Sequence, residues 1–477
     1  MPVNSFENYY MSWKPDKNQL KYPIYVSLAD KLEADINNGI LKANTKLPPQ
    51  RELADFLDVN LTTVTRAFKI CQLKGLIYAI TGKGTFVASL HNPQYLNKKI
   101  DSSSEDKPLD DEIIDMALMN PFYSCNSLIT ETVQNITSRK DFSKLMEYSV
   151  PNGTLHHRKC AKKWLQQFNT QIDEENIAIT CGSQHALLIS LISLFTSGDK
   201  IAVDEYTYLN FIRLANSLNI QLIPIKNDEC GMIPEVLDKQ CKLNNIKGIY
   251  LMSSCNNPTN IILNMNRRKE LAHIIKKHDL ILIEDDIYSF LNIEKLPPIS
   301  ALLPNQSIYI NGISKSICAG LRVGFISFPS SFKSKIINNI YDTNLNTSLL
   351  NVEIVSELIN NGVASVIMNK KIDMLSQRSL IYEQYFPSKN KNINKLGFHR
   401  WLKLPENLDS EYFELLAQKH NVHVLSSTRF SVGKYPNNNF IRLMICSPKD
   451  NSQLERGLEI IKNLLEKSNN SNDLFII

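Results

Sequence analysis

The stretch SIYINGISKSICAGLRVG, residues 307–324, decides the fold of the larger part of the chain. It opens with a short β-prone run, typical of a buried strand, and continues with glycines and polar residues that would lie where the strand ends. From about Glu112 to Leu465, similar short apolar runs alternate with longer amphipathic stretches. This alternation indicates an α/β architecture with a mainly parallel sheet.

Polar side chains follow three more strand-like runs, which are Ile177–Thr180, Gly248–Met252 and Leu280–Ile283. In open α/β sheets, ligands bind beyond the carboxyl ends of the strands, so we expect these groups to gather at one edge. Together with the first run, they supply a Gly-Ser turn at Ser183 and Gln184, Asn257, Asp285 with Tyr288, and Lys315 with Arg322.

This collection is what a pyridine cofactor that bears a phosphate and an aldehyde requires. A lysine amine forms an imine with the aldehyde, and a carboxylate keeps the ring nitrogen protonated so that the ring acts as an electron sink. Backbone N–H groups at a strand-to-helix turn and an arginine bind the phosphate. We therefore predict pyridoxal 5'-phosphate as the cofactor, with Lys315 and Asp285 as the catalytic residues.

The pattern Ser314-Lys315-x-x-x-x-Gly320-Leu321-Arg322-x-Gly324 resembles that of class I, fold-type I aminotransferases, and we assign residues 112–466 to such a domain. The resemblance implies a Schiff base on Lys315 and an Asp285 partner for the ring nitrogen. It implies the following further contacts: Asn257 and Tyr288 to the phenolic oxygen; Ser183, Gln184 and Arg322 to the phosphate; Tyr208 stacked on the ring; Tyr148 on a neighbouring subunit's phosphate; and Arg442 on a substrate carboxylate.

Several residues depart from that family pattern. Gly312 stands where a serine or threonine commonly offers a hydroxyl to the phosphate, and Asn260 replaces the glycine of an N-P-x-G turn. Tyr206 replaces a frequent proline, and Ser426-Ser427 replaces a frequent Pro-Gly pair. None of these changes removes a core cofactor contact, but together they weaken the case for efficient turnover.

Residues 20–90 predict a separate, mainly helical unit. Apolar residues recur at helical spacing in Ile24–Ile36, a short helix is expected near Gln50–Leu57, and a third helix is expected at Leu61–Lys74 after a tight turn. Two β-rich runs around Gly82-Lys83-Gly84 then predict a hairpin. A short helix, a turn and a longer helix with polar groups at its start match a helix-turn-helix, whose second helix enters the major groove.

This unit resembles the GntR type of winged helix. The matching residues are Leu47-Pro48-Pro49-Gln50-Arg51-Glu52-Leu53-Ala54, Thr62-Thr63-Val64-x-Arg66-Ala67 and Gly82-Lys83-Gly84-Thr85-Phe86-Val87. The resemblance implies that Arg51, Thr63, Arg66 and Lys83 contact double-stranded DNA. Asn60 stands where serine or arginine is frequent in the family, which leaves the base preference open.

Composition adds few constraints. The chain of 477 residues carries a net charge of +5, too mild to name a partner without local patches. Its nine cysteines form no C-x-x-C pair, so we expect reduced thiols and no metal site. We find no secretory or membrane-spanning segment and expect a cytoplasmic protein. Residues 91–111 are polar and read as a linker.

The combination of winged helix, linker and aminotransferase-like domain resembles the MocR subfamily of GntR regulators. It implies a homodimeric transcription regulator that depends on pyridoxal phosphate and senses an amine, an amino acid or the cofactor itself. An active aminotransferase that transfers an amino group to a 2-oxo acid is the alternative. A third reading keeps DNA binding and gives the large domain only a role in dimerisation, without cofactor.

Overall fold

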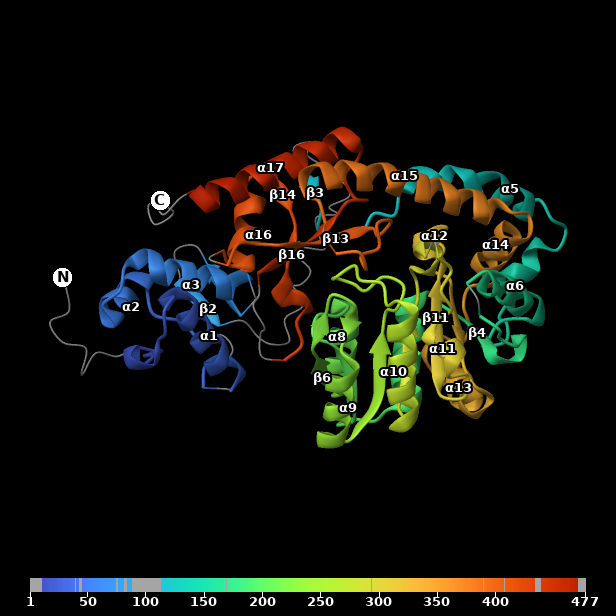
Figure 1. Cartoon of the computed structure of the whole chain (residues 1–477), viewed down its shortest axis with the longest axis horizontal. Helices are drawn as coiled ribbons and strands as arrows, with labels where there is room; N and C mark the ends of the chain where they lie inside the picture. Colours follow the sequence, from blue (N-terminus) through green and yellow to red (C-terminus); the bar gives the residue numbers. More distant parts are fainter. Residues whose placement is uncertain are drawn as a thin grey trace. The chain divides into compact units, whose positions relative to one another are not determined.

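The computed structural model describes residues 11–38, 40–42, 45–73, 76–80, 84–87, 113–168, 170–292, 294–388, 390–406, 408–433 and 439–470. The chain divides into two compact units, Met1–Asp110 and Asp111–Ile477. Figure 1 shows the elements of each unit. The predicted linker 91–111 lies outside the described residues.

In the described residues of the first unit there are three α-helices, one short 3-10 helix and a two-stranded hairpin; the α-helices and the hairpin match those that the sequence predicts. The elements are η1 (Lys17–Gln19), α1 (Ile24–Asn37), α2 (Gln50–Leu57), α3 (Leu61–Leu73), β1 (Ile77–Ile80) and β2 (Gly84–Val87). β1 and β2 pair antiparallel. The tight turn between α2 and α3 depends on Asp58, which adopts a left-handed conformation with φ 50°, and on Asn60, whose side chain accepts a hydrogen bond from the Thr62 backbone N–H at 3.0 Å.

The core of this unit also includes residues that precede α1. Trp13 is buried, and its indole N–H donates to Asp35 of α1 at 2.9 Å. Trp13 and Leu28 belong to the same apolar cluster, which is drawn from α1, α2, α3 and the hairpin. The winged-helix fold is therefore braced by a segment that the sequence pattern did not assign to it.

The second unit is built on a seven-stranded sheet. Its strand order is β4 (Ile177–Thr180), β12 (Gly324–Ser327), β11 (Ser307–Gly312), β10 (Ile281–Asp285), β9 (Ile246–Leu251), β5 (Lys200–Asp204) and β6 (Gln221–Ile225). Strands β11, β10, β9, β5 and β6 pair parallel, and β12 runs antiparallel to both of its neighbours. The predicted α/β fold with a mainly parallel sheet is confirmed.

Helices cover the sheet, which explains why its central strands are apolar on both faces. They are α7 (Ser183–Leu194), α8 (Leu209–Ser217), α9 (Pro234–Leu243), α10 (Met265–Lys277), α11 (Ile299–Leu302), α12 (Ile313–Ser316) and α13 (Lys333–Asn344). Further helices of this unit are α5 (Thr130–Thr137), α6 (Leu155–Gln166), α14 (Leu349–Asn360) and α15 (Val363–Tyr385).

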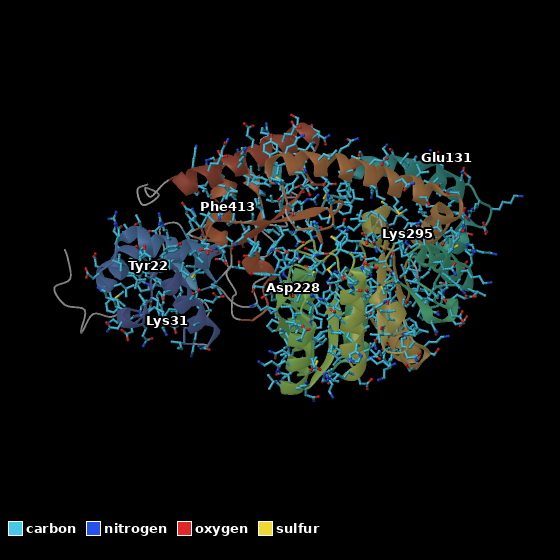
Figure 2. The ribbon with its side chains drawn as sticks, in the orientation of Figure 1. Tyr22, Lys31, Glu131, Asp228, Lys295 and Phe413 are labelled. Carbon is cyan, nitrogen blue, oxygen red and sulfur yellow. The ribbon has the colours of Figure 1, made fainter. Side chains whose placement is uncertain are left out.

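A smaller lobe follows α15. It contains β13 (His399–Lys403), β15 (Leu425–Ser426), β16 (Phe440–Met444), α16 (Ser410–Lys419) and α17 (Asn451–Asn470), together with β14 (Val422–His423) paired to β3 (Ile114–Asp115). Figure 1 shows α15 and α17 alongside each other, and Figure 2 labels Phe413 of α16, which is fully buried in this lobe. Two short strands, β7 (Asn227–Asp228) and β8 (Gly231–Met232), form a separate hairpin.

The nine cysteines are free. Within the part of the chain that the structure describes, no helix is both long and apolar enough to cross a membrane.

Candidate functional site

The carboxyl ends of the central strands bring the predicted residues together. Asp285 is the last residue of β10 and is 1% exposed. Lys315 lies in α12, which follows β11 directly, and β11 is the neighbour of β10. Asn257 and Tyr288, which follow β9 and β10, are both buried. The short connections after three adjacent parallel strands therefore place an amine, a carboxyl, an amide and a phenol at one edge of the sheet.

Asp285 presents one free oxygen. The hydroxyl of Tyr250 donates to its Oδ2 at 3.1 Å, whereas Oδ1 is buried and has no hydrogen-bond partner among the described residues. Burial raises the pKa of the Asp285 carboxyl to about 7, and the hydrogen bond from Tyr250 opposes that rise. A buried acceptor that the chain leaves unpaired is costly unless a ligand donates to it.

Lys315 is partly buried, and burial lowers the pKa of its amine to about 8. The nearby guanidinium groups of Arg322 and Arg442 lower this pKa further, while Asp285 opposes them. Compared with an ordinary lysine, more of the amine is therefore unprotonated near neutral pH, and the unprotonated amine is the form that reacts with a carbonyl carbon.

An anion-binding turn lies beside Lys315. Gly182 has φ 82° and precedes α7, so the first N–H groups of a twelve-residue helix are open to a ligand. A Cβ at Gly182 would come within 2.7 Å of Arg322 Nη2, so only glycine lets that guanidinium lie over the turn. Arg322 also donates from Nη1 to Ser314 Oγ at 3.2 Å.

The Ser183 side chain occupies the space that a side chain at position 312 would fill. A Cβ at Gly312 would come within 2.0 Å of Ser183 Oγ. The Ser183 hydroxyl therefore lies where a side chain at position 312 would begin. Gln184 follows Ser183 in α7, and its Oε1 lies 3.5 Å from the hydroxyl of Tyr208, which stands at the start of α8.

Arg442 is the second arginine of the site. It is 6% exposed, donates to Asn257 Oδ1 at 3.0 Å and to the Ala117 carbonyl at 2.8 Å, and lies 4.6 Å from the ring centre of Phe430. Its Nε is buried without a partner among the described residues. A buried guanidinium with an unused donor suits a carboxylate ligand.

Tyr148 differs from the other predicted cofactor ligands. It is 85% exposed and follows η3 (Phe142–Met146), so it is not packed into the interior of its own chain. Three residues that the prediction missed contact the site, namely Tyr250, Ser314 and Lys371. Lys371 donates from α15 to the backbone carbonyl oxygens of Lys315 and Ile317 at 3.1 and 2.7 Å.

The first unit presents a groove of about 520 Å³ between the hairpin and the start of α2 and α3. Arg51 is exposed and lines this groove, as does Lys46, which the sequence reasoning missed and whose side chain crosses Gly84. Thr63 and Arg66 are partly buried on α3, and the Arg66 guanidinium lies 5.9 Å from the ring centre of Tyr25. Lys83 lies outside the described residues.

The large unit fits a cofactor with a pyridine nitrogen, an aldehyde and a phosphate. Asp285 Oδ1 is an orphaned acceptor, and Gly182 and Gly312 leave space that a Cβ would fill. Lys315, Ser183 and Arg322 supply an amine, a hydroxyl and a guanidinium around that space. The fold and the site define the class of protein as a winged-helix unit joined to an aminotransferase-like unit.

Comparisons with known proteins agree with this class. Residues 112–461 match the family model for aminotransferase class I and II, and residues 24–87 match that for bacterial regulatory proteins of the gntR family. The uncharacterised HTH-type transcriptional regulator YdeF of Bacillus subtilis is 36% identical over 98% of this chain and 99% of its own. The HTH-type transcriptional regulator NorG of Staphylococcus aureus is 23% identical, over 78% of this chain and 90% of its own.

Solved structures share the fold of the large unit. An archaeal alanine:glyoxylate aminotransferase superposes with a TM-score of 0.71 at 21% identity, and covers 78% of this chain and 94% of its own. The kynurenine aminotransferase of Pyrococcus horikoshii gives 0.70 at 22% identity, over 78% of this chain and 95% of its own.

The chain belongs to the MocR-like branch of the GntR regulators, in which a DNA-binding winged helix is fused to a class I and II aminotransferase domain. It is a transcription regulator by family, and the cofactor of its large domain is pyridoxal 5'-phosphate.

Proposed function

We propose that the chain regulates transcription in response to an amine, an amino acid or pyridoxal phosphate, which it senses through its aminotransferase-like unit. One observation carries the proposal. In a chain with a winged helix, Lys315, the free Oδ1 of Asp285 and the free Nε of Arg442 all lie in one buried site. Such a site is equipped to hold a cofactor and a carboxylate ligand together.

We assign the cofactor contacts as follows. Asp285 accepts from the ring nitrogen, Asn257 and Tyr288 contact the phenolic oxygen, and Tyr208 stacks on the ring. Ser183, Gln184 and Arg322 hold the phosphate at the start of α7. When bound, the cofactor supplies an aldehyde that reacts reversibly with primary amines. Lys315 supplies the resident amine, and Arg442 orients a ligand through its carboxylate.

The signal would pass from this site to the winged helices as a shift between conformations. A ligand shifts such an equilibrium only by its differential affinity for the two states. We further propose a cytoplasmic homodimer, since the 85% exposure of Tyr148 leaves it available to a neighbouring subunit's phosphate. Two subunits would present two winged helices to repeated or inverted half-sites, contacted by Arg51, Thr63, Arg66 and Lys83.

The test measures binding of the full-length protein to DNA from upstream of its own gene, with and without pyridoxal phosphate. We expect the cofactor to change the affinity of the wild type and to leave Lys315→Ala unaffected. Lys335→Ala, which removes an exposed lysine of the same unit, is the matched control and should behave as the wild type. Equal cofactor responses in Lys315→Ala and the wild type would contradict sensing through Lys315. If the protein develops no visible absorption band after the cofactor is added, the large unit does not hold the cofactor. Its role would then be dimerisation alone.

A working aminotransferase is the second candidate, because Lys315, Asp285 and Arg442, the residues that the family resemblance ties to catalysis and substrate binding, are all present. Steady conversion of an amino donor and a 2-oxo acid, lost in Lys315→Ala, would favour it. A single turnover without steady conversion would favour the sensor.

A further inference from the structure

We infer that Tyr250 is a positioning residue that orients the carboxylate of Asp285 toward the ring nitrogen of the cofactor. The inference rests on the proposed role of Asp285 and adds a residue that no motif identifies. Tyr250 lies in β9, and the register of the sheet pairs it with Ile283 of β10, two residues before Asp285. Its hydroxyl donates to Asp285 Oδ2 at 3.1 Å.

The ring of Tyr250 is held in place. It stacks on Phe211 of α8 with ring centres 3.8 Å apart and planes 8° from parallel. Both rings are 0% exposed. A stacked, fully buried ring cannot turn its hydroxyl elsewhere, so the hydrogen bond to Oδ2 is fixed by packing. α8 follows Tyr208 directly, so the helix that holds Tyr250 is also the one that starts at the proposed stacking residue.

The hydrogen bond gives the two carboxylate oxygens of Asp285 different roles. Oδ2 is occupied by Tyr250, and Oδ1 is the buried atom without a partner among the described residues. Burial raises the pKa of Asp285 to about 7, and a donor on Oδ2 favours the ionised form that a ring N–H requires. Burial and the Asp285 charge hold the pKa of Tyr250 well above its ordinary value, so the phenol stays protonated and remains a donor.

The neighbouring strand offers a matched control. Tyr309 of β11 is 2% exposed, and its hydroxyl donates to Asp286 Oδ2 at 3.0 Å. Tyr309→Phe therefore removes the same group from the same kind of buried carboxyl, one residue further along the chain. Any general effect of deleting a buried tyrosine hydroxyl should appear in both variants, whereas an effect through Asp285 should appear only in Tyr250→Phe.

The experiment measures the affinity of the full-length protein for pyridoxal phosphate and the pH midpoint of the visible absorption band of the bound cofactor. In Tyr250→Phe we expect affinity to fall about tenfold and the midpoint to rise by about one pH unit, as the loss of one hydrogen bond to a carboxylate implies. The midpoint rises because a less ionised Asp285 leaves the ring less electron-withdrawing, so the nitrogen of Lys315 keeps its proton to higher pH.

Asp285→Asn separates the possible failures. If it changes the affinity and the midpoint while Tyr250→Phe changes neither, the inference about Tyr250 is overturned and the role of Asp285 stands. If Asp285→Asn also changes nothing, both fall. In the double variant, Tyr250→Phe should add little to Asp285→Asn, because it acts through that carboxyl. Full additivity, or an equal midpoint shift in Tyr309→Phe, would also overturn the inference.

Discussion

At the scale of single residues, the departure from the family pattern at Gly312 is matched by the position of the Ser183 hydroxyl. Position 312 lacks the hydroxyl that the family resemblance leads one to expect, and the Ser183 hydroxyl fills the place where a Cβ at 312 would lie, at 2.0 Å. We therefore expect Gly312→Ser alone to displace Ser183 and to weaken pyridoxal phosphate binding at least about tenfold, as overpacking of a tight site does.

The double variant tests this explanation. Adding Ser183→Ala removes the clashing oxygen and leaves a Cβ-to-Cβ approach of 3.3 Å, which a small shift relieves. Affinity, measured by fluorescence titration, should return to within a few-fold of the wild type. If the double variant binds no better than Gly312→Ser, the two positions do not exchange roles.

The residues that could be predicted from the sequence without the family resemblance are those that end a strand or follow it directly, because chain connectivity alone carries them to the edge of the sheet. Asp285 and Lys315 are of this kind. Tyr250 could not be predicted, because its partner is 35 residues away and a tyrosine within an apolar strand reads as core packing. Lys371 is similar, since it lies 56 residues from Lys315 on a long helix, next to the exposed Lys370.

At the scale of elements, α15 contacts two separate segments of the site through two buried cationic side chains on one face of the helix. Lys371 donates to the carbonyl oxygens of Lys315 and Ile317, and Arg378, seven residues further on, donates to those of Ile445 and Pro448. Ile445 follows β16, which carries Arg442. One helix therefore holds both the segment that carries Lys315 and the strand that carries Arg442.

Replacing Lys371 should loosen only one of these attachments. Methionine has a similar volume and removes a desolvated charge, so we expect the free energy of unfolding of Lys371→Met to change by less than about 1.5 kcal/mol. The segment 313–318, which includes α12, loses two hydrogen bonds, and its amide hydrogen exchange should accelerate about tenfold. Lys370→Met, at the adjacent exposed position, should leave that exchange unchanged. Equal amide exchange rates at residues 313–318 in Lys371→Met and Lys370→Met would contradict the conclusion that Lys371 holds this segment.

A second element-scale contact joins α14 to α6 and to the turn after α5. Glu353 of α14 accepts from Arg139 at 2.5 Å and lies 2.9 Å from His157 Nε2. The hydrogen bond with His157, more than that with Arg139, lowers the pKa of Glu353 to about 2. Since both oxygens of Glu353 are engaged, we interpret the cluster as a structural ion pair.

Glu353→Gln should therefore destabilise the large unit by about 2 kcal/mol at neutral pH, the usual contribution of a hydrogen bond to a charged group. The pKa of Glu353 is lower in the fold than its ordinary value of 4.5, so its contribution is present above that value and is lost as the pH falls toward about 2. The free energies of unfolding of Glu353→Gln and the wild type, measured by chemical denaturation, should therefore differ less at about pH 3 than at neutral pH. Glu357→Gln, which removes the more exposed partner of Arg139, should cost less at neutral pH.

At the scale of the whole molecule, the two units have separate cores. One apolar cluster uses residues from Trp13 to Val87, and the other clusters use residues from Ile114 to Leu464; among the described residues, no cluster draws on both sets. The binding residues are divided in the same way, with the cofactor site in the large unit and the DNA-contacting helices in the small one. Each ligand should therefore stabilise its own unit first.

Thermal unfolding of the full-length protein should accordingly show two transitions. Pyridoxal phosphate at a hundred times its Kd should raise the free energy of unfolding of the large unit by about 2.7 kcal/mol. A ligand that binds only the folded state adds that amount. A DNA fragment that carries the operator should raise the midpoint temperature at which the small unit unfolds. In Lys315→Ala the cofactor's effect on the larger transition should shrink, while the DNA effect should persist. If both ligands moved one common transition instead, the units would unfold as one, and the sensing signal would pass through direct energetic coupling between their cores.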